Sequence, residues 1–196
     1  MTAKHFLAAF LGALAMFLAA FIFHMFTPLG EAGITPMPGP EAVMSAMSSS
    51  IRDKPGMYMF PTGGYSPDLP REQHAAAIDK MMEEMKTNPS GLLIYHPAGR
   101  TFNFGKCLAI QFGIDFLKAL LVVYLLAQTS VTGFGGRTMF VTIAGALAAI
   151  ATTPSLWNWY GFAGTYACAN VVMITVEFLV AGIVIALVLR RKNLEG

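Results

Sequence analysis

Four apolar runs of about 20 residues divide the chain, and they limit its fold more than any other feature. They extend from Phe6 to Phe26, from Cys107 to Ala127, from Thr138 to about Leu156 and from Ala167 to Leu189. At about 1.5 Å per residue, a helix of this length matches the hydrocarbon core of a bilayer. Because lipid offers the backbone no hydrogen-bond partners, each run must be helical. The sequence therefore predicts a membrane all-α fold, a bundle of four transmembrane helices.

The charge content argues against two other classes of protein, soluble domains and nucleic-acid-binding proteins. Of the 196 residues, 55% are hydrophobic and only 12% are Asp, Glu, Lys or Arg, about half the charged fraction of a typical soluble domain. The net charge of +2 is too small to indicate nucleic-acid binding. We expect the partners to be the lipid bilayer and other membrane protein subunits, with no nucleic acid.

Basic residues indicate which helix ends face the cytoplasm. Lys4 precedes the first run, Arg137 lies in the second connection, and Arg190, Arg191 and Lys192 follow the fourth run, whereas the third connection carries no charge. Cytoplasmic loops are enriched in Lys and Arg. Both termini and the second connection are therefore expected in the cytoplasm, with residues 27–106 on the other side of the membrane.

The first run must be distinguished from a cleavable secretory signal. Its length of about 21 residues exceeds the roughly 7 to 15 of the apolar region of a signal sequence, and no Ala-x-Ala-like site lies directly before Thr27-Pro28. We expect a retained anchor helix in residues 1–26 and an extracytoplasmic insert in residues 27–106. Residues 107–196 would form a three-helix region with a short cytoplasmic tail.

The insert has the pattern of a small α+β unit. A helix is expected over Glu41 to Arg52, and a second helix begins at Pro70 and is stopped by Asn88-Pro89. Strands are expected over Gly56 to Phe60 and Leu92 to Tyr95. A unit of about 65 residues is too small to bury a large core. We therefore expect it to lean on the membrane helices or on a partner.

Two short motifs lie in the insert, between one apolar run and three later ones. They are Gly56-x-Tyr58-x-Phe60-Pro61 and Leu92-Leu93-Ile94-Tyr95-His96-Pro97-x-Gly99. In this arrangement the chain resembles hypothetical bacterial multi-span membrane proteins that have no assigned activity. The resemblance implies a bacterial inner membrane, with residues 27–106 in the periplasm, and it implies no particular chemistry.

Three charged residues fall inside the apolar runs. Asp115 and Lys118 lie in the second run, and Glu177 lies in the fourth. A charge at membrane depth costs about 2.5 to 3.5 kcal/mol, so each residue is expected to find a partner. Asp115 and Lys118 are three residues apart and can pair on one helix. All three lie roughly 12 to 16 Å from the outer ends of their helices and can meet at one level.

This group of charges has two interpretations. One is an ion or proton relay, or a counter-charge for a substrate, in a small transport component. The other is a neutralised group that fixes helix packing or docks a partner subunit. We favour the second, because the sequence has no further charged group on an inward path and no pair of broken helices. Nearby hydrogen bonds are expected from four polar residues, Gln111, Thr152, Thr153 and Thr175.

The two cysteines, Cys107 and Cys168, both lie at the outer end of a run, where an oxidising periplasm permits a disulfide. At about 100° per residue, Cys107 shares a face with Lys118, whereas Cys168 and Glu177 lie on nearly opposite faces. One contact between straight helices cannot easily hold both the disulfide and the ion pair. We therefore expect two unpaired, buried thiols, with the disulfide as the alternative.

Methionine is abundant in the insert, and thioether and imidazole ligands suit copper. The candidate ligands are Met57 and Met59 on one strand face, with His74, Met81 and Met85 on one helix face. Periplasmic copper binding is therefore a third functional interpretation. We favour a packing role, because methionine at helical spacing usually fills a core. No other cofactor is predicted.

Aromatic and small residues mark further surfaces of the bundle. Trp157, Trp159 and Tyr160 of the third connection are expected to anchor it at the outer lipid headgroups, with an aromatic binding site as the alternative. Small residues allow close helix approach, either within the bundle or between chains. They are Gly12, Ala15 and Ala19 in the first run, and Ala144, Gly145, Ala148 and Ala149 in the third.

No common catalytic motif is present in the sequence. The sequence contains no Walker loop and none of the motifs G-x-S-x-G, H-E-x-x-H and C-x-x-C. Together with the undersized insert and the small-residue faces, this favours a non-catalytic accessory or structural subunit of a larger membrane protein complex. The alternatives are the transport component and the copper-binding protein.

Overall fold

The computed structural model of the chain describes residues 1–190, so Arg191 and Lys192 of the basic tail lie outside the described residues. The chain divides into two compact units. The helical unit contains Met1–Thr35 together with the chain from Asn103 onward, and the insert unit contains Pro36–Phe102.

The helical unit contains four long helices. They are α1 (Ala3–Phe26), α4 (Phe104–Ala127), α5 (Phe134–Tyr160) and α6 (Gly164–Val188). Each is long and apolar enough to cross a membrane. The prediction of four long apolar helices is confirmed.

Local capping explains why two helices extend beyond their predicted limits. The Asn103 side chain accepts a hydrogen bond of 2.9 Å from the Lys106 amide, so α4 begins at Phe104 rather than at Cys107. At the end of α5, Gly161 adopts a left-handed backbone with φ of 71°, the conformation that commonly ends a helix. The segment Trp157–Tyr160 is therefore the last turn of α5, and its assignment to the third connection was wrong.

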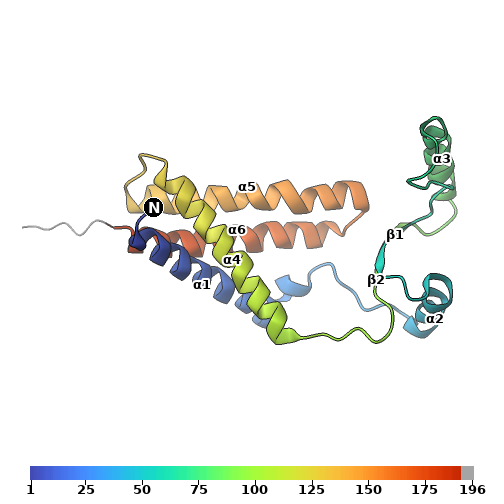
Figure 1. Ribbon diagram of the computed structural model, residues 1–196, viewed down its shortest axis with the longest axis horizontal. Coiled ribbons are helices and arrows are strands. Elements are labelled where there is room, and N and C mark those ends of the chain that lie inside the picture. Colours follow the sequence, from blue (N-terminus) through green and yellow to red (C-terminus); the bar gives the residue numbers. More distant parts are fainter. Residues whose placement is uncertain (191–196) are drawn as a thin grey trace, which may run out of the picture. The chain divides into compact units, whose positions relative to one another are not determined.

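The helices pack in the order α4, α1, α6, α5. α5 and α6 lie side by side, α6 packs against α1, and α1 packs against α4, whereas α4 makes no extensive contact with α6 (Figure 1). Edge-to-face aromatic pairs join α1 to α4, with ring centroids 5.8 Å apart for Phe10 and Phe112 and 5.9 Å apart for Phe17 and Phe112. α6 is the most buried helix, and α4 lies at an edge.

Two glycines allow the closest helix contacts. A Cβ atom at Gly145 of α5 would lie 2.3 Å from the Phe178 side chain of α6, and one at Gly12 of α1 would lie 2.9 Å from Ile185. Gly12, Gly145 and Ala149 are buried inside this chain, whereas Ala148 is exposed. Most of these small residues therefore allow close contacts between helices of this chain rather than with other chains.

Basic side chains tie one end of the helical unit together. Arg137 donates hydrogen bonds to the Leu189 carbonyl (2.7 Å) and to the Val131 carbonyl (3.3 Å). Lys4 donates to the Arg190 carbonyl (2.7 Å). Cations stabilise the unpaired carbonyls at a helix C-terminus. The N-terminus, the connection between α4 and α5, and the end of α6 therefore lie together, at what we call the terminal end.

The insert unit is a loose α+β arrangement. It contains α2 (Pro40–Ile51), β1 (Gly56–Phe60), α3 (Arg71–Glu84) and β2 (Gly91–Tyr95), in the predicted order of helix, strand, helix, strand. The strands pair antiparallel, with Gly56 opposite Tyr95. Its buried hydrophobic residues are Ala77 and Tyr95, a very small core for a unit of this length.

The segment after α1 belongs to the helical unit, whereas the predicted insert of residues 27–106 included it. A short 3-10 helix, η1 (Pro28–Glu31), packs against α1 and α6. Gly33 then lies so close to α6 that a Cβ atom would sit 2.8 Å from the Tyr166 backbone nitrogen. This contact fixes residues 27–35 to the helices.

The close contact at Gly145 predicts a sensitive substitution. Gly145→Ala should lower the free energy of unfolding by about 1 to 3 kcal/mol, because the added methyl overlaps Phe178. The matched control is Gly113→Ala on α4, where the new methyl meets open space and stability should be unchanged or slightly raised. Circular dichroism during SDS titration in mixed micelles measures both, and equal stability of the two variants would contradict the contact.

Candidate functional site

The three charged residues of the apolar runs come together in the structure, and we call them the charge cluster. Asp115 and Lys118 lie near the middle of α4, and Glu177 lies near the middle of α6. At about 1.5 Å per residue, Asp115 and Glu177 are each roughly 16 to 20 Å from both ends of their helices. The cluster is therefore remote from both ends of the helical unit.

Lys118 joins the two carboxylates. Its Nζ atom lies 2.7 Å from Asp115 Oδ1 and 3.9 Å from Glu177 Oε2. The Asp115 side chain is 1% exposed and that of Glu177 is 11% exposed, whereas the Lys118 side chain is 30% exposed. The ammonium also lies 5.8 Å from the centroid of the Phe178 ring, an attractive cation–π distance. No sequence pattern indicated a role for this ring, because aromatic residues are common in apolar helices.

Hydrogen bonding satisfies the cluster only in part. Gln111 Nε2 donates to Asp115 Oδ1 at 3.1 Å, but Asp115 Oδ2 is buried without a hydrogen-bond partner. The Glu177 carboxylate has the ion pair at 3.9 Å, which is beyond hydrogen-bond distance. When all three groups are ionised, two carboxylates share one ammonium. The cluster then carries one excess negative charge.

Among the four polar residues expected nearby, Gln111 makes the hydrogen bond to the cluster. The Thr175 hydroxyl donates to the Val171 carbonyl at 2.7 Å, and the Thr152 hydroxyl donates to the Ala148 carbonyl at 3.1 Å. Threonine commonly bonds back to its own helix in this way. Thr153 is buried in α5. Thr152 and Thr175 therefore bond within their own helices.

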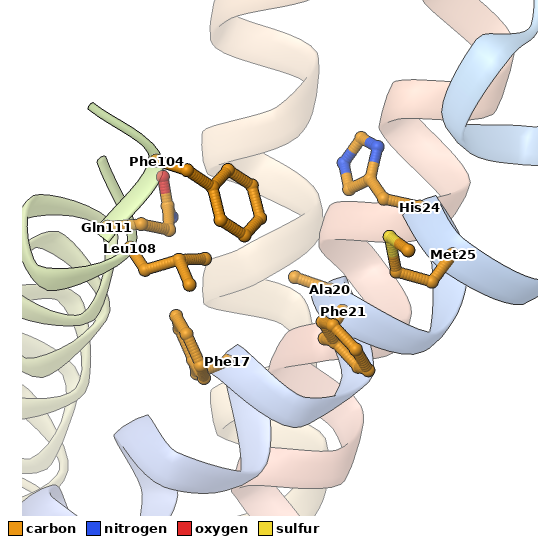
Figure 2. Close-up of a pocket in the computed structure, with 8 residues that line it drawn as sticks. All are labelled: Phe17, Ala20, Phe21, His24, Met25, Phe104, Leu108 and Gln111. Carbon is orange, nitrogen blue, oxygen red and sulfur yellow. The ribbon is translucent and has the colours of Figure 1, made fainter. Parts of the chain in front are cut away.

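A groove between α1 and α4 leads towards the cluster from the end opposite the terminal end. Figure 2 shows side chains of the two helices on either side of this groove. The groove has a volume of about 200 Å³. The lining residues are Phe17, Ala20, Phe21, His24 and Met25 of α1, and Phe104, Leu108 and Gln111 of α4. Gln111 therefore borders the groove and also bonds to Asp115.

Between the cluster and the terminal end, the core of the helical unit is apolar. The buried side chains there are Val122, Val123 and Leu126 of α4, and Ala181 and Ile185 of α6. The chain of polar contacts that begins at Gln111 thus stops at the middle of the described helices.

The thiols differ from the prediction in their burial. Cys107 and Cys168 are free, but both are exposed, so the expectation of buried thiols was wrong. α4 is an edge helix that packs mainly on α1, which leaves Cys107 on its outer side. Cys168 borders an open apolar groove of about 450 Å³ between α5 and α6, together with Ile150 and Pro154.

The predicted aromatic anchors are exposed in the last turn of α5. Trp157 is 54% exposed, Trp159 is 78% exposed and Tyr160 is 52% exposed. They lie at the end of α5 opposite Arg137 and the terminal end. This position suits rings that contact lipid headgroups.

The candidate copper ligands lie in the insert unit. Met57 and Met59 share one face of β1 and are 65% and 41% exposed. His74 Nε2 lies 2.8 Å from the Leu69 carbonyl oxygen. Met81 on α3 is half-buried, and Met85, which directly follows that helix, is exposed. β1 and α3 make no extensive contact, and this arrangement gives no support for a common metal site.

Comparison with known protein families, with characterised proteins and with solved structures gives no match. The class of the protein therefore rests on its own features. These are four helices of membrane-spanning length and a buried charge cluster at their midpoint.

The geometry predicts that the cluster is sensitive to the loss of its cation. Lys118→Met should lower the free energy of unfolding by about 3 kcal/mol, because it leaves two carboxylates without a cation. The triple variant Asp115→Leu, Lys118→Met and Glu177→Leu should regain most of the lost free energy of unfolding, since no unpaired charge remains. Reversible unfolding in mixed micelles measures both variants. A Lys118→Met variant as stable as the natural protein would contradict the geometry.

Proposed function

We propose that the chain is a multi-pass membrane protein and acts as a non-catalytic accessory or structural subunit of a larger membrane protein complex. The partner covers α4, the edge helix of the bundle. One observation carries the proposal: polar side chains lie on the outer surface of α4 near its middle.

The relevant surface is a line of residues that we call the α4 stripe. Its members are four and three residues apart in alternation, the spacing at which one helix packs along another. They are Cys107, Gln111, Ile114, Lys118, Leu121 and Leu125. Ile114 is 47% exposed and Leu121 is 54% exposed, while the Lys118 side chain is 30% exposed.

The cost of lipid contact supports a protein partner on this stripe. A charged group near the bilayer centre costs about 2.5 to 3.5 kcal/mol even on lenient scales. Lys118 is too far from either helix end for its ammonium to reach the headgroups, because an extended lysine side chain spans only about 6 Å. A neighbouring protein helix removes this cost. The remaining face of α4 is apolar and suits lipid.

The insert unit also supports a role in assembly. Met57, Met59 and Ile94 lie on one face of the two-stranded sheet and are 65%, 41% and 61% exposed. A two-stranded sheet is marginally stable without further packing. Contact with a partner protein would cover this apolar face.

For location, we propose the inner membrane of a bacterium. Lys4 and Arg137 lie at the terminal end, and the enrichment of basic residues in cytoplasmic loops supports a cytoplasmic position for that end. Residues 27–106 would then be periplasmic. The resemblance to bacterial multi-span membrane proteins supports the same setting.

Substitution on the α4 stripe tests the proposed function. Ile114→Trp should shift the protein to a smaller assembly in mild-detergent native electrophoresis, because the bulky ring prevents close helix packing. Leu147→Trp on α5 is the matched control, since Leu147 is 68% exposed and lies outside the stripe. A natural protein that migrates as a lone monomer, or an assembly unchanged by Ile114→Trp, would count against the proposal.

A small ion- or proton-coupled transport component is the second candidate. It is favoured by the buried Asp115 Oδ2, which has no hydrogen-bond partner, and by the groove that reaches Gln111. The apolar core between the cluster and the terminal end argues against it. We therefore rank it below the structural role.

Flux measurements test whether the protein is a transport component. In proteoliposomes, a transport component would carry a proton or cation flux that Glu177→Gln abolishes, because the substitution removes a charge from the centre of the pathway. Thr175→Val on the same helix is the control, since its hydroxyl bonds to Val171 of its own helix. Our account predicts no flux above that of empty vesicles for any of the three proteins.

A further inference from the structure

We propose that the partner on the α4 stripe is a transmembrane helix with a lysine or arginine near its midpoint, and that this cation pairs with the Glu177 carboxylate beside Lys118. The inference rests on the proposed function and names the chemistry of the partner. It follows from the charge, the hydrogen bonding and the accessibility of the charge cluster.

The ionised cluster carries one excess negative charge. Asp115 and Glu177 carry two negative charges when ionised, and Lys118 carries one positive charge. No other Lys or Arg lies in the middle of any of the four described long helices. A buried charge without a partner is costly in a medium of low polarity. Either a proton on one carboxylate or a cation from outside this chain balances this charge, and the exposure of the Lys118 and Glu177 side chains leads us to propose the cation.

Hydrogen bonding shows the same deficit. Lys118 lies 2.7 Å from Asp115 but 3.9 Å from Glu177, so one ammonium satisfies one carboxylate well and the other poorly. Asp115 Oδ2 is buried and unpartnered. A second basic side chain beside Lys118 would supply a donor to the Glu177 carboxylate, while the buried Asp115 keeps its contacts with Lys118 and Gln111.

The cluster can be reached from the outside. α4 makes no extensive contact with α6, and the Lys118 side chain bridges the two helices. That side chain is 30% exposed and the Glu177 side chain is 11% exposed. A basic side chain on a neighbouring helix can therefore approach the cluster from the side of Lys118.

The position of the site identifies the partner as a helix. From Cys107 to Leu125 the α4 stripe is about 27 Å long, which is close to the thickness of a bilayer core. Lipid headgroups do not reach its middle. A second copy of this chain does not fit either, because each copy brings the same excess negative charge and no spare cation at that depth.

A designed helix tests the proposed chemistry with the full-length protein in lipid vesicles. The probe is a labelled helix of leucine and alanine, long enough to span the bilayer, with lysine at its midpoint. The matched probe has leucine there. Energy transfer from the labelled protein measures association. The lysine helix should associate about tenfold more tightly, the preference expected for one polar contact between membrane helices.

Variants of the cluster make the test specific. Glu177→Gln should abolish most of the preference for the lysine helix, and Asp115→Asn should reduce it. Thr175→Val should leave it unchanged, because Thr175 lies on α6 and donates to Val171 of its own helix. Circular dichroism and SDS titration verify that each variant is folded.

The outcomes separate this inference from the proposed function. Equal association of the lysine and leucine helices, or a preference that survives Glu177→Gln, would overturn the inference. Neither result would affect the proposed function, which fails instead if the natural protein is a lone monomer. A preference for the lysine helix that Glu177→Gln removes supports the inference.

Discussion

The rest of the structure depends on one ammonium shared between two carboxylates in the middle of apolar helices. Lys118 holds Asp115 of its own helix closely and Glu177 of α6 at a longer distance, across a gap that the backbones of α4 and α6 do not close. In lipid, this link cannot be exchanged for hydrogen bonds to water. The link therefore orients α4, but one ammonium does not fully balance two carboxylates. The proposed basic partner helix follows from this excess of negative charge.

The remaining helices form a more complete unit around α6. Close contacts at Gly145 and Gly12 bring α5 and α1 against it, and Arg137 and Lys4 bind carbonyl oxygens at its end. Dispersion contacts and hydrogen bonds of this kind are the main forces between helices in lipid. The contrast between a well-packed α6 and an exposed, partly polar α4 supports an interaction surface on α4 rather than on α5.

Much of this arrangement could be predicted from the sequence, because membrane helices and buried charges have strong local signals. Run length identified the four helices, and the spacing of Asp115, Lys118 and Glu177 along them indicated a common depth. Residue patterns could not predict which helices are neighbours, so Cys107 and Cys168 were expected to be buried and are exposed. The end of α5 was also missed, although Gly161 is a typical residue at that position. The ring of Phe178 over Lys118 depends on tertiary packing and leaves no sequence signal.

Photo-crosslinking in intact membranes tests the central claim most directly. A photoreactive amino acid replaces Ile114 on the α4 stripe or Leu147 on the outer face of α5, in cells that normally make the protein. Our account predicts a discrete crosslinked protein product from position 114 and lipid adducts from position 147. Lipid adducts alone at position 114 would contradict it, because the polar middle of α4 would then face the bilayer without a partner.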